Sequence, residues 1–400
     1  MSLSKLMVVG SGLVTLVVAG IASAFMAWSI GAGSSGSTPF APAVGANAIT
    51  TLRAAFVVGI LGFAGAVLQG ANVTEAVGRE LVVGVTLSPL SATLALVIAG
   101  GLVAVGVFAG YPIATAFTVT GAVVGTGLAL GGGPAWDKYA QIGTLWVLVP
   151  FVGGATAYAL GRLLRDDRLP ASVTVPLLGA SVGAIVANIE FALLGPSGGS
   201  ASIGQAVAAA TPGPTAIGVA GTTAGLSVAA GGLLFWRSAA DTTTAIREFL
   251  LAMGALVAFS AGGTQVGLAI GPLLPLLDPY DLPLTLVLAG GGLGLLAGSW
   301  TGAPRMIKAL SQDYSSLNPM LSIAALIPSF AIAQTAVLFG IPVSFNEIIV
   351  SAIVGSGLAG GDSAVSRNKA LRTIGAWVGS LGVSFVLSYV GYRAVAVLLG

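Results

Sequence analysis

The chain has 400 residues, of which 56% are apolar and only 7% charged, with 60 glycines and a mean hydropathy of +1.01. A soluble domain carries about 25% charged residues, so this composition excludes an ordinary water-exposed surface. The net charge of +2 argues against a nucleic-acid partner. The sequence has no cysteine and no histidine, which excludes thiolate chemistry, imidazole proton relays and Ser-His-Asp catalysis. We therefore expect a membrane protein that is not an enzyme and has no cofactor.

The apolar residues fall into segments of the length that membrane helices require, since a bilayer core about 30 Å thick needs about 20 apolar residues per helix. We interpret the first segment as a span because it is longer than the apolar region of a signal peptide; the triplet at 22–24 leaves a cleaved signal peptide as the alternative. Glycine runs and prolines interrupt several segments, so we expect some half-helices or re-entrant hairpins. The sequence predicts an all-α polytopic membrane protein with about 12 transmembrane or re-entrant helical segments: 7–30, 54–72, 82–109, 113–132, 142–164, 173–194, 217–236, 246–262, 283–301, 320–340, 343–360 and 373–399.

The basic residues predict the orientation, because lysine and arginine favour the cytoplasmic side of a membrane. With the N-terminus outside, the threaded chain places 11 Lys and Arg residues inside and 4 outside. The uncharged loop at 195–216 then also lies outside. We therefore expect both termini outside, in a multi-pass protein of a prokaryotic plasma membrane.

An internal repeat organises the chain. Segments 110–131 and 340–361 share nine of 22 residues at a fixed offset of 230, and coincidence in a glycine-rich chain is the alternative. Seven crossings separate equivalent positions, and an odd number requires the two halves to be inverted in the membrane. Inverted repeats with broken helices are typical of secondary transporters, whose substrate binds near the midplane. We expect three parts: repeat 1 at 1–165, a linker with two transmembrane helices at 166–236, and the inverted repeat 2 at 237–400.

Two polar passages occupy corresponding positions in the repeats. Residues 31–38 (GAGSSGST) follow the first span, and residues 261–268 (AGGTQVGL) are their counterpart. Glycine lets a helix unwind, and the freed amide groups together with hydroxyls form an uncharged cradle for an anion. The alternatives are an exposed loop for the first passage and a tight helix contact for the second.

A second pair of features is the proline-led segments that begin at Pro112 and Pro342. Proline suits the first turn of a helix, where N–H groups stay free and the helix carries about half a positive charge. Thr115 and Thr118 in one repeat, and Ser344 and Asn346 in the other, add side-chain donors. We expect these helix ends to bind an oxyanion without any lysine or arginine.

Two glutamates lie within apolar segments, Glu190 and Glu347. An acid at the centre of a membrane helix costs at least about 2.5–3.5 kcal/mol, so a function is the first hypothesis. Glu347 lies beside the proposed anion site and is our candidate for binding a proton or Na⁺. For Glu190 we favour a polar contact between helices. The charged residues near the end of the second span, Glu75, Arg79 and Glu80, are interpreted as interfacial salt bridges.

The chain resembles the PiT family of inorganic phosphate transporters over almost its full length apart from the linker. The family's Pro-Val-Ser-Thr-Thr-His segment leads into a VGA-x-VG-x-GLA run, and this chain retains Pro112 with residues 121–129 (GAVVGTGLA) and Pro342 with residues 354–359 (VGSGLA). Residues 266–272 (VGLAIGP) and 302–308 (GAPRMIK) are also similar to the family pattern.

The resemblance implies a site whose residues have changed. The family's Asn-Asp pairs correspond to Ser34-Ser35 and to Thr264-Gln265, and a later asparagine corresponds to Thr38, so both cation-binding aspartates are missing. Both family histidines are also replaced. Residues that can hydrogen-bond to an anion remain at these aligned positions, two of them in place of the aspartates, and they are our candidate substrate-binding residues: Ser34, Ser35, Thr38, Thr115, Thr264, Gln265, Ser344 and Asn346. A two-aspartate Na⁺ site does not survive, so coupling depends on Glu347 with H⁺ or Na⁺, or is absent.

These observations predict a secondary transporter of inorganic phosphate that works by alternating access. Sulfate or another oxyanion on the same fold is one alternative, and an anion-binding sensor that does not transport is another. A membrane enzyme is a third alternative, without a catalytic constellation to support it. The expected partners are the oxyanion and the lipid bilayer, and a homodimer is one expected assembly.

Overall fold

The computed structural model describes residues 3–196, 199–361 and 365–399, and most of them are helical. The bounds of the helices are α1 Leu3–Ile30, α2 Ala41–Gly45, α3 Thr51–Gln69, α4 Ala71–Arg79, α5 Pro89–Ala109, α6 Thr115–Ala129, α7 Trp136–Leu164, α8 Ala171–Asn188, α9 Ile203–Ala210, α10 Thr215–Ala240, α11 Thr242–Ile270, α12 Leu274–Leu277, α13 Leu284–Thr301, α14 Ala303–Gln312, α15 Pro319–Leu338, α16 Phe345–Gly360 and α17 Arg367–Leu399. A π-helical turn η1 (Gly31–Ser35) and the 3-10 turns η2 (Gly271–Leu273) and η3 (Asp278–Tyr280) continue neighbouring helices. In the described part of the chain, four two-residue strands form two antiparallel pairs, β1 (Val82–Val83) with β2 (Gly133–Pro134) and β3 (Glu190–Phe191) with β4 (Ala201–Ser202).

The prediction of an all-α membrane protein with about 12 helical segments is confirmed. Among the described residues, 10 helices are long and apolar enough to cross a membrane, and α6 and α16 are two shorter apolar helices. At about 1.5 Å per residue these two are about 22–24 Å long, less than the bilayer core of about 30 Å. They are the two proline-led segments, which are therefore the expected half-helices.

Three expected segment boundaries were wrong. The segment expected at 173–194 ends at Asn188, so Glu190 lies outside the helix and pairs with Ser202 in the β3–β4 ladder. The loop expected at 195–216 contains β4 and the short helix α9, which begins with a capping box formed by Ser202 and Gln205. The segment expected at 246–262 is the much longer α11, which extends from Thr242 to Ile270.

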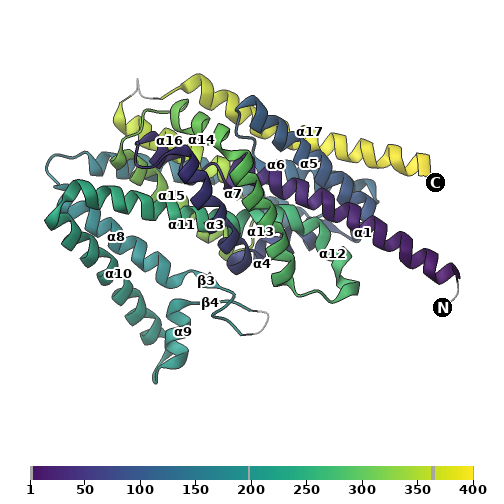
Figure 1. Ribbon diagram of the computed structural model, residues 1–400, viewed down its shortest axis with the longest axis horizontal. Coiled ribbons are helices and arrows are strands. Elements are labelled where there is room, and N and C mark those ends of the chain that lie inside the picture. Colours follow the sequence, from purple (N-terminus) through teal and green to yellow (C-terminus); the bar gives the residue numbers. More distant parts are fainter. Residues whose placement is uncertain (1–2, 197–198, 362–364, 400) are drawn as a thin grey trace.

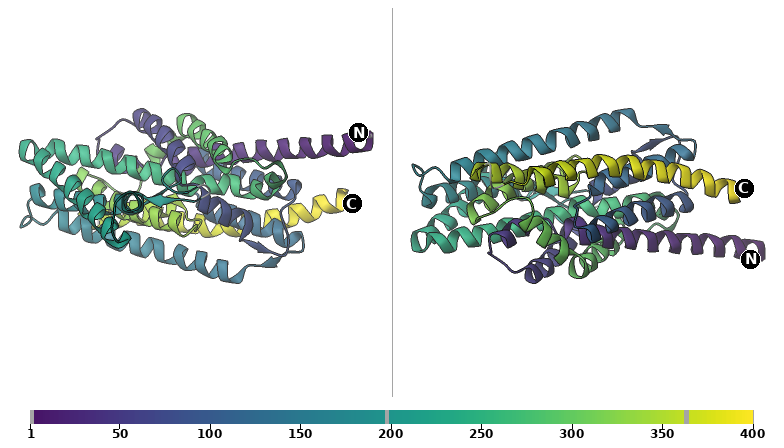
Figure 2. Two further views of the ribbon diagram at one scale, coloured as in Figure 1. Left: turned by 90° about the horizontal axis from the view of Figure 1, so that it is seen from below. Right: turned by 90° about the horizontal axis from the view of Figure 1, so that it is seen from above.

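The helices α8, α9 and α10 stand apart from the remaining helices, at the lower left of Figure 1. Helix α10 packs mainly against α8, and only 6% of its most apolar window is buried inside the molecule. By contrast, the corresponding windows of α11 and α15 are 72% and 78% buried, so these two helices form the centre of the protein. Both termini lie at the same end of the elongated molecule in Figures 1 and 2.

Each short helix packs against one long helix by close contact at a glycine. Helix α6 lies against α17, and α16 lies against α7. A Cβ atom added at Gly125 of α6 would clash with the Phe385 carbonyl oxygen, and one added at Gly355 of α16 would clash with the Gly154 carbonyl oxygen. Glycines 125 and 355 are equivalent positions of the predicted repeat. In a membrane the hydrophobic effect does not drive helices together, because lipid tails are as apolar as the side chains. Helix association therefore depends on close packing, which small residues such as glycine allow.

We expect Gly355→Ala to destabilise the protein, because the added methyl group meets backbone rather than a side chain that can move. Overpacking of this kind costs about 1–3 kcal/mol. The matched control is Gly375→Ala on α17, where the added Cβ has no atom within 4 Å among the described residues. Thermal unfolding of the purified variants is the measurement. A Gly355→Ala protein that melts at the temperature of the control would contradict the packing described here.

Candidate substrate site

Helix α1 ends inside the protein in a π-helical turn. Residues 31–43 are all buried, including Ser34 (0% exposed) and Ser35 (2% exposed). The hydroxyls of Ser37 and Thr38 donate to the Ser34 carbonyl oxygen at 3.2 and 3.0 Å. These bonds satisfy a carbonyl at the helix terminus. The first helix is thus interrupted where the sequence predicts it, and the alternative of an exposed loop is wrong.

The expected break at residues 261–268 is wrong, because α11 is regular through Ile270 and loosens only in η2. The glycines here serve helix packing: a Cβ atom at Gly262 would clash with the Gly62 carbonyl oxygen of α3, and one at Gly267 would lie 2.6 Å from the Thr74 backbone nitrogen. The Thr264 hydroxyl donates to the Ser260 carbonyl oxygen of its own helix at 3.1 Å. This passage is therefore the tight helix contact that we kept as its alternative.

Gln265 of α11 joins the four elements that meet at the site. Its Oε1 accepts hydrogen bonds from the Thr115 hydroxyl at 2.7 Å and from the Ser34 hydroxyl at 3.2 Å. Its Nε2 donates to the Val343 carbonyl oxygen at 2.9 Å. Thr115 is the first residue of α6, and Val343 directly precedes Ser344, the N-cap of α16. One fully buried amide thus connects the end of α1 with the N-termini of both short helices.

Asn346 makes a second connection between the repeats. Its Nδ2 donates to the Ile113 carbonyl oxygen at 2.7 Å, just before α6, and to the Gly33 carbonyl oxygen in η1 at 2.9 Å. These two carbonyl acceptors fix the orientation of the side-chain amide, because in the flipped orientation Oδ1 would face two carbonyl oxygens and could donate to neither. The Oδ1 atom is therefore an acceptor, and it is buried without a hydrogen-bond partner among the described residues.

The two helix N-termini at this site have no side-chain cap within the described part of the chain. Serine is a good N-cap residue, yet the hydroxyl of Ser344 makes no capping hydrogen bond to α16. The N-cap residue of α6 is Ala114, whose side chain cannot accept one. The Ser344 and Ser35 hydroxyls are buried and have no partner in residues 3–196, 199–361 and 365–399. Buried polar groups normally find partners, so these two hydroxyls are available to hydrogen-bond to a ligand at the helix N-termini. Free N–H groups and hydroxyls at a helix N-terminus suit an anion.

Two tryptophans support the connectors that lead into the short helices. Trp146 of α7 donates from Nε1 to the Pro342 carbonyl oxygen at 2.9 Å, and Trp377 of α17 donates to the Pro112 carbonyl oxygen at 2.8 Å. Each long helix thus holds the connector of the opposite repeat. Sequence reasoning missed both residues, although an offset of 231 relates them and is only one more than the offset of the repeat.

We expect Trp377→Phe to lower both the unfolding temperature and the affinity for the substrate. The change keeps an aromatic ring but leaves the Pro112 carbonyl without its donor, at a cost of about 1–3 kcal/mol for a buried group. Trp136→Phe is the matched control, since Trp136 is 72% exposed. Thermal unfolding and substrate titration of both variants test this. Equal behaviour of the two variants would show that the connector does not need the indole N–H.

Glu347 lies in the first turn of α16, next to Asn346, and is 1% exposed. Its Oε2 atom has no hydrogen-bond partner among the residues that the structure describes. Asn346 bonds toward η1 and the connector before α6, whereas Glu347 lines a cavity between α7, α16 and α17. The carboxyl group is thus adjacent to the anion site in sequence and faces another side of α16.

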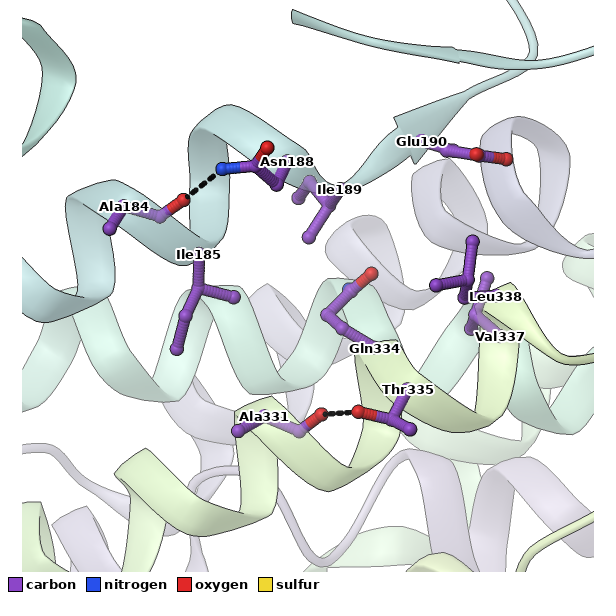
Figure 3. Close-up of a pocket in the computed structure, with 10 residues that line it drawn as sticks. All are labelled: Ala184, Ile185, Asn188, Ile189, Glu190, Ala331, Gln334, Thr335, Val337 and Leu338. Carbon is purple, nitrogen blue, oxygen red and sulfur yellow. Dashed lines mark hydrogen bonds between the residues drawn. The ribbon is translucent and has the colours of Figure 1, made fainter. Parts of the chain in front are cut away.

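Within the described residues, Glu190 is not part of the hydrogen-bond network of this site. It accepts a hydrogen bond from the Ser200 hydroxyl and lines a cavity of about 380 Å³ between α8 and α15. Figure 3 shows the Gln334 side chain pointing from α15 toward the end of α8, and Glu190 on the strand that follows α8. Gln334 and Gln69 form reciprocal amide hydrogen bonds at 3.1 and 3.2 Å. Gln334 also donates to the Ser260 hydroxyl at 2.6 Å, so this network stabilises the contact of α3, α11 and α15.

The charged residues after the second span form surface ion pairs, as interpreted from the sequence. Arg79 bonds to Glu75 at 2.9 Å and to Asp278 at 2.7 Å, and Lys138 bonds to Glu80 at 2.7 Å. Exposed pairs of this kind contribute at most about 1 kcal/mol.

The structure brings most of the candidate residues together. Ser34, Thr115 and Gln265 share hydrogen bonds, Asn346 joins them through Gly33, and Ser35 and Ser344 are unpartnered among the described residues of the same elements. Thr38 and Thr264 are buried but bond to backbone carbonyls of their own segments. No group of three or more acidic residues that suits a metal ion occurs in the described ranges.

The geometry defines a class of membrane transport protein, with two short helices whose buried N-termini meet at a polar site. A solved structure called "The sodium-dependent phosphate transporter" has the same fold, with a TM-score of 0.78 and 21% sequence identity over 96% of this chain and 99% of that chain.

The chain belongs to the phosphate transporter family, whose family model matches residues 30–388. It is 24% identical over 413 residues to an inorganic phosphate transporter (2-1, chloroplastic) of Arabidopsis thaliana, covering 92% of this chain and 70% of that protein. It is 26% identical over 403 residues to a protein of Pyrococcus horikoshii named as a candidate phosphate permease, covering 94% and 96% of the two chains.

Proposed function

We propose that this protein is a secondary transporter of inorganic phosphate, which binds where the N-termini of α6 and α16 meet η1 and α11. The observation that carries the proposal is the set of buried, unpartnered groups at two uncapped helix N-termini, within the described residues. The hydroxyls of Ser35 and Ser344 and the free amide N–H groups are donors for phosphate oxygens. Ser34, Thr115, Gln265 and Asn346 hold these elements in place, and Thr38 and Thr264 support the backbone beside them.

The Asn346 Oδ1 atom supports phosphate rather than sulfate. At neutral pH phosphate retains at least one O–H group, which can donate to this buried acceptor, whereas sulfate has none. A site built to accept a hydrogen bond from its ligand rejects an analogue that lacks the donor, because the acceptor then stays unpaired. The family assignment and the names of the relatives favour the same anion.

We further propose that Glu347 is the coupling-ion residue and that the ion is a proton. Glu347 is the third residue of α16, so an ionised carboxylate there acts electrostatically on the positive helix end that would bind phosphate, although the side chain itself faces a cavity on another side of α16. An ionised Glu347 competes with the anion for this end, and protonation removes the competition. Proton binding and phosphate binding then favour each other. Na⁺ bound by the same carboxylate is the alternative that the coupling experiments below distinguish.

For the whole molecule we propose alternating access of two inverted repeats, at 1–165 and 237–400, with residues 166–236 as a linker. The equivalent glycine contacts at 125 and 355 and the crossed tryptophan bonds support the repeats. The protein would lie in a prokaryotic plasma membrane with both termini outside, and the position of the termini at one end of the molecule supports an even number of crossings. A homodimer remains our proposal for the assembly.

Competition for bound phosphate tests the substrate assignment. We expect arsenate, which also carries an O–H group, to displace radiolabelled phosphate from the purified protein about as well as phosphate does. Sulfate should be at least about 100-fold weaker, because it leaves Asn346 Oδ1 unpaired. Hydrogen phosphate and sulfate are both dianions, so the comparison is matched for charge. Equal displacement by sulfate would show that the site does not recognise the O–H group of phosphate.

A further inference from the structure

A second cavity lies between α7, α16 and α17, and none of the candidate substrate-binding residues of the phosphate site lines it. Its volume is about 870 Å³, within the range of about 300–1,000 Å³ typical of small-molecule sites. Val147, Phe151 and Val378 line it and are 62%, 71% and 62% exposed. They lie on long apolar helices whose outer faces meet the bilayer, so the cavity opens toward lipid rather than toward water.

One acidic side chain lines this apolar cavity. Glu347 is the only charged residue among the described residues that line it, and no lysine or arginine lines it. Its Oε2 atom has no hydrogen-bond partner in the described ranges, although the residue is 99% buried, being 1% exposed. An unpaired carboxylate in such surroundings is costly, so a ligand that pairs with it gains more than it would in water.

The predicted repeat explains how the cavity arises. Phe117 and Glu347 are equivalent positions, as are Trp146 and Trp377 within one residue, and all four line the cavity. Phe117 stacks on Trp146 with ring centroids 3.8 Å apart, which fills one half of the space. The other half has the smaller glutamate in place of phenylalanine. The exchange leaves space beside Trp377 and introduces a negative charge there.

We propose that this cavity binds an apolar amine that enters from the bilayer, with its ammonium group paired to the Glu347 carboxylate. A neutral amine takes the proton of the carboxyl group, or an amine cation binds the ionised carboxylate; both routes give the same ion pair. The ring of Trp377 adds cation–π attraction, and the apolar walls take the hydrocarbon part. This site is distinct from the phosphate site, and its occupation requires no transport.

Tryptophan fluorescence of the full-length protein in phosphatidylcholine nanodiscs tests the proposal without phosphate or any ion gradient. The probe is a brominated N,N-dimethylalkylamine, whose bromine quenches nearby tryptophan, compared with the brominated alcohol of the same chain length. We expect saturable quenching by the amine and weaker, non-saturating quenching by the alcohol. The Trp377→Phe variant should lose part of the saturable signal, which places the probe in this cavity.

The variants separate charge from shape. Glu347→Gln keeps the size of the side chain and should weaken amine binding at least about tenfold, equivalent to about 1.4 kcal/mol. Glu347→Phe should fill the cavity and abolish saturable quenching. Glu190→Gln removes a carboxylate elsewhere and should bind the amine like the wild type.

Two results would overturn the proposal. One is that Glu347→Gln binds the amine as tightly as the wild type does. The other is that the alcohol quenches as strongly and as saturably as the amine, which would assign the cavity to a lipid chain. Loss of phosphate transport with amine binding intact would affect only the proposed function.

Discussion

Gln265→Met is expected to reduce phosphate uptake by about 100-fold or more. Methionine nearly matches the volume of glutamine, but the hydroxyls of Ser34 and Thr115 lose their acceptor and the Val343 carbonyl loses its donor. Each buried polar group left unpaired costs about 1–3 kcal/mol, and about 1.4 kcal/mol corresponds to a factor of ten. The N-termini of α6 and α16 are then no longer held together, so the phosphate site loses its geometry. The measurement is the initial rate of radiolabelled phosphate uptake into proteoliposomes.

The matched control for this prediction is Gln312→Met on α14, where the side chain is exposed. It should take up phosphate like the wild type. Size-exclusion chromatography and thermal unfolding establish that both variants are folded before their rates are compared. Wild-type uptake by a folded Gln265→Met protein would show that the bridge between the short helices is not needed for binding.

Glu347→Gln is expected to abolish accumulation of phosphate driven by a proton gradient while phosphate–phosphate exchange continues. Glutamine imitates the protonated carboxyl group, so the anion still finds the positive end of α16, but no proton is carried with it. Phosphate binding should also lose the pH dependence that titration of Glu347 confers on the wild type, whose binding weakens as the carboxyl group ionises. Counterflow and gradient-driven uptake, measured in the same proteoliposomes, separate the two activities.

The matched control is Glu190→Gln, which removes a carboxylate that lies outside the spans and bonds to Ser200 rather than to a residue of the site. It should retain driven uptake. Driven accumulation by Glu347→Gln at the wild-type level would exclude this residue as the coupling group. If a Na⁺ gradient drives uptake by the wild type and a proton gradient does not, and Glu347→Gln loses the Na⁺-driven uptake, the carboxylate binds Na⁺ instead of a proton.

Much of the fold follows from the sequence, because hydropathy, length and glycine spacing are physical properties of each segment. The proline-led segments were identified as half-helices, and the equivalence of Gly125 and Gly355 follows from a fixed offset. The error at α11 has a physical cause: glycine in a membrane helix permits both unwinding and close packing. Only the neighbouring helix, which presses against Gly262 and Gly267, decides between the two.

The site was predictable in part for a similar reason. Ser34 and Gln265 were identified because polar passages occupy corresponding positions in the two repeats, and Thr115 and Asn346 because they follow the two prolines. Backbone acceptors such as the Gly33 and Pro112 carbonyls leave no mark in a sequence, so the roles of Trp146 and Trp377 were missed. The face of α16 that Glu347 occupies also depends on how α7 and α17 pack. Sequence alone placed it beside the anion site, and the structure places it at a separate cavity.

The most direct test of the account is uptake of radiolabelled phosphate by the wild-type protein in proteoliposomes, with proton and Na⁺ gradients imposed separately. We predict saturable uptake that a proton gradient drives and that an excess of sulfate does not inhibit. Absence of uptake under either gradient, from protein shown to be folded and correctly inserted, would contradict the central claim and leave a protein that binds an anion without transporting it.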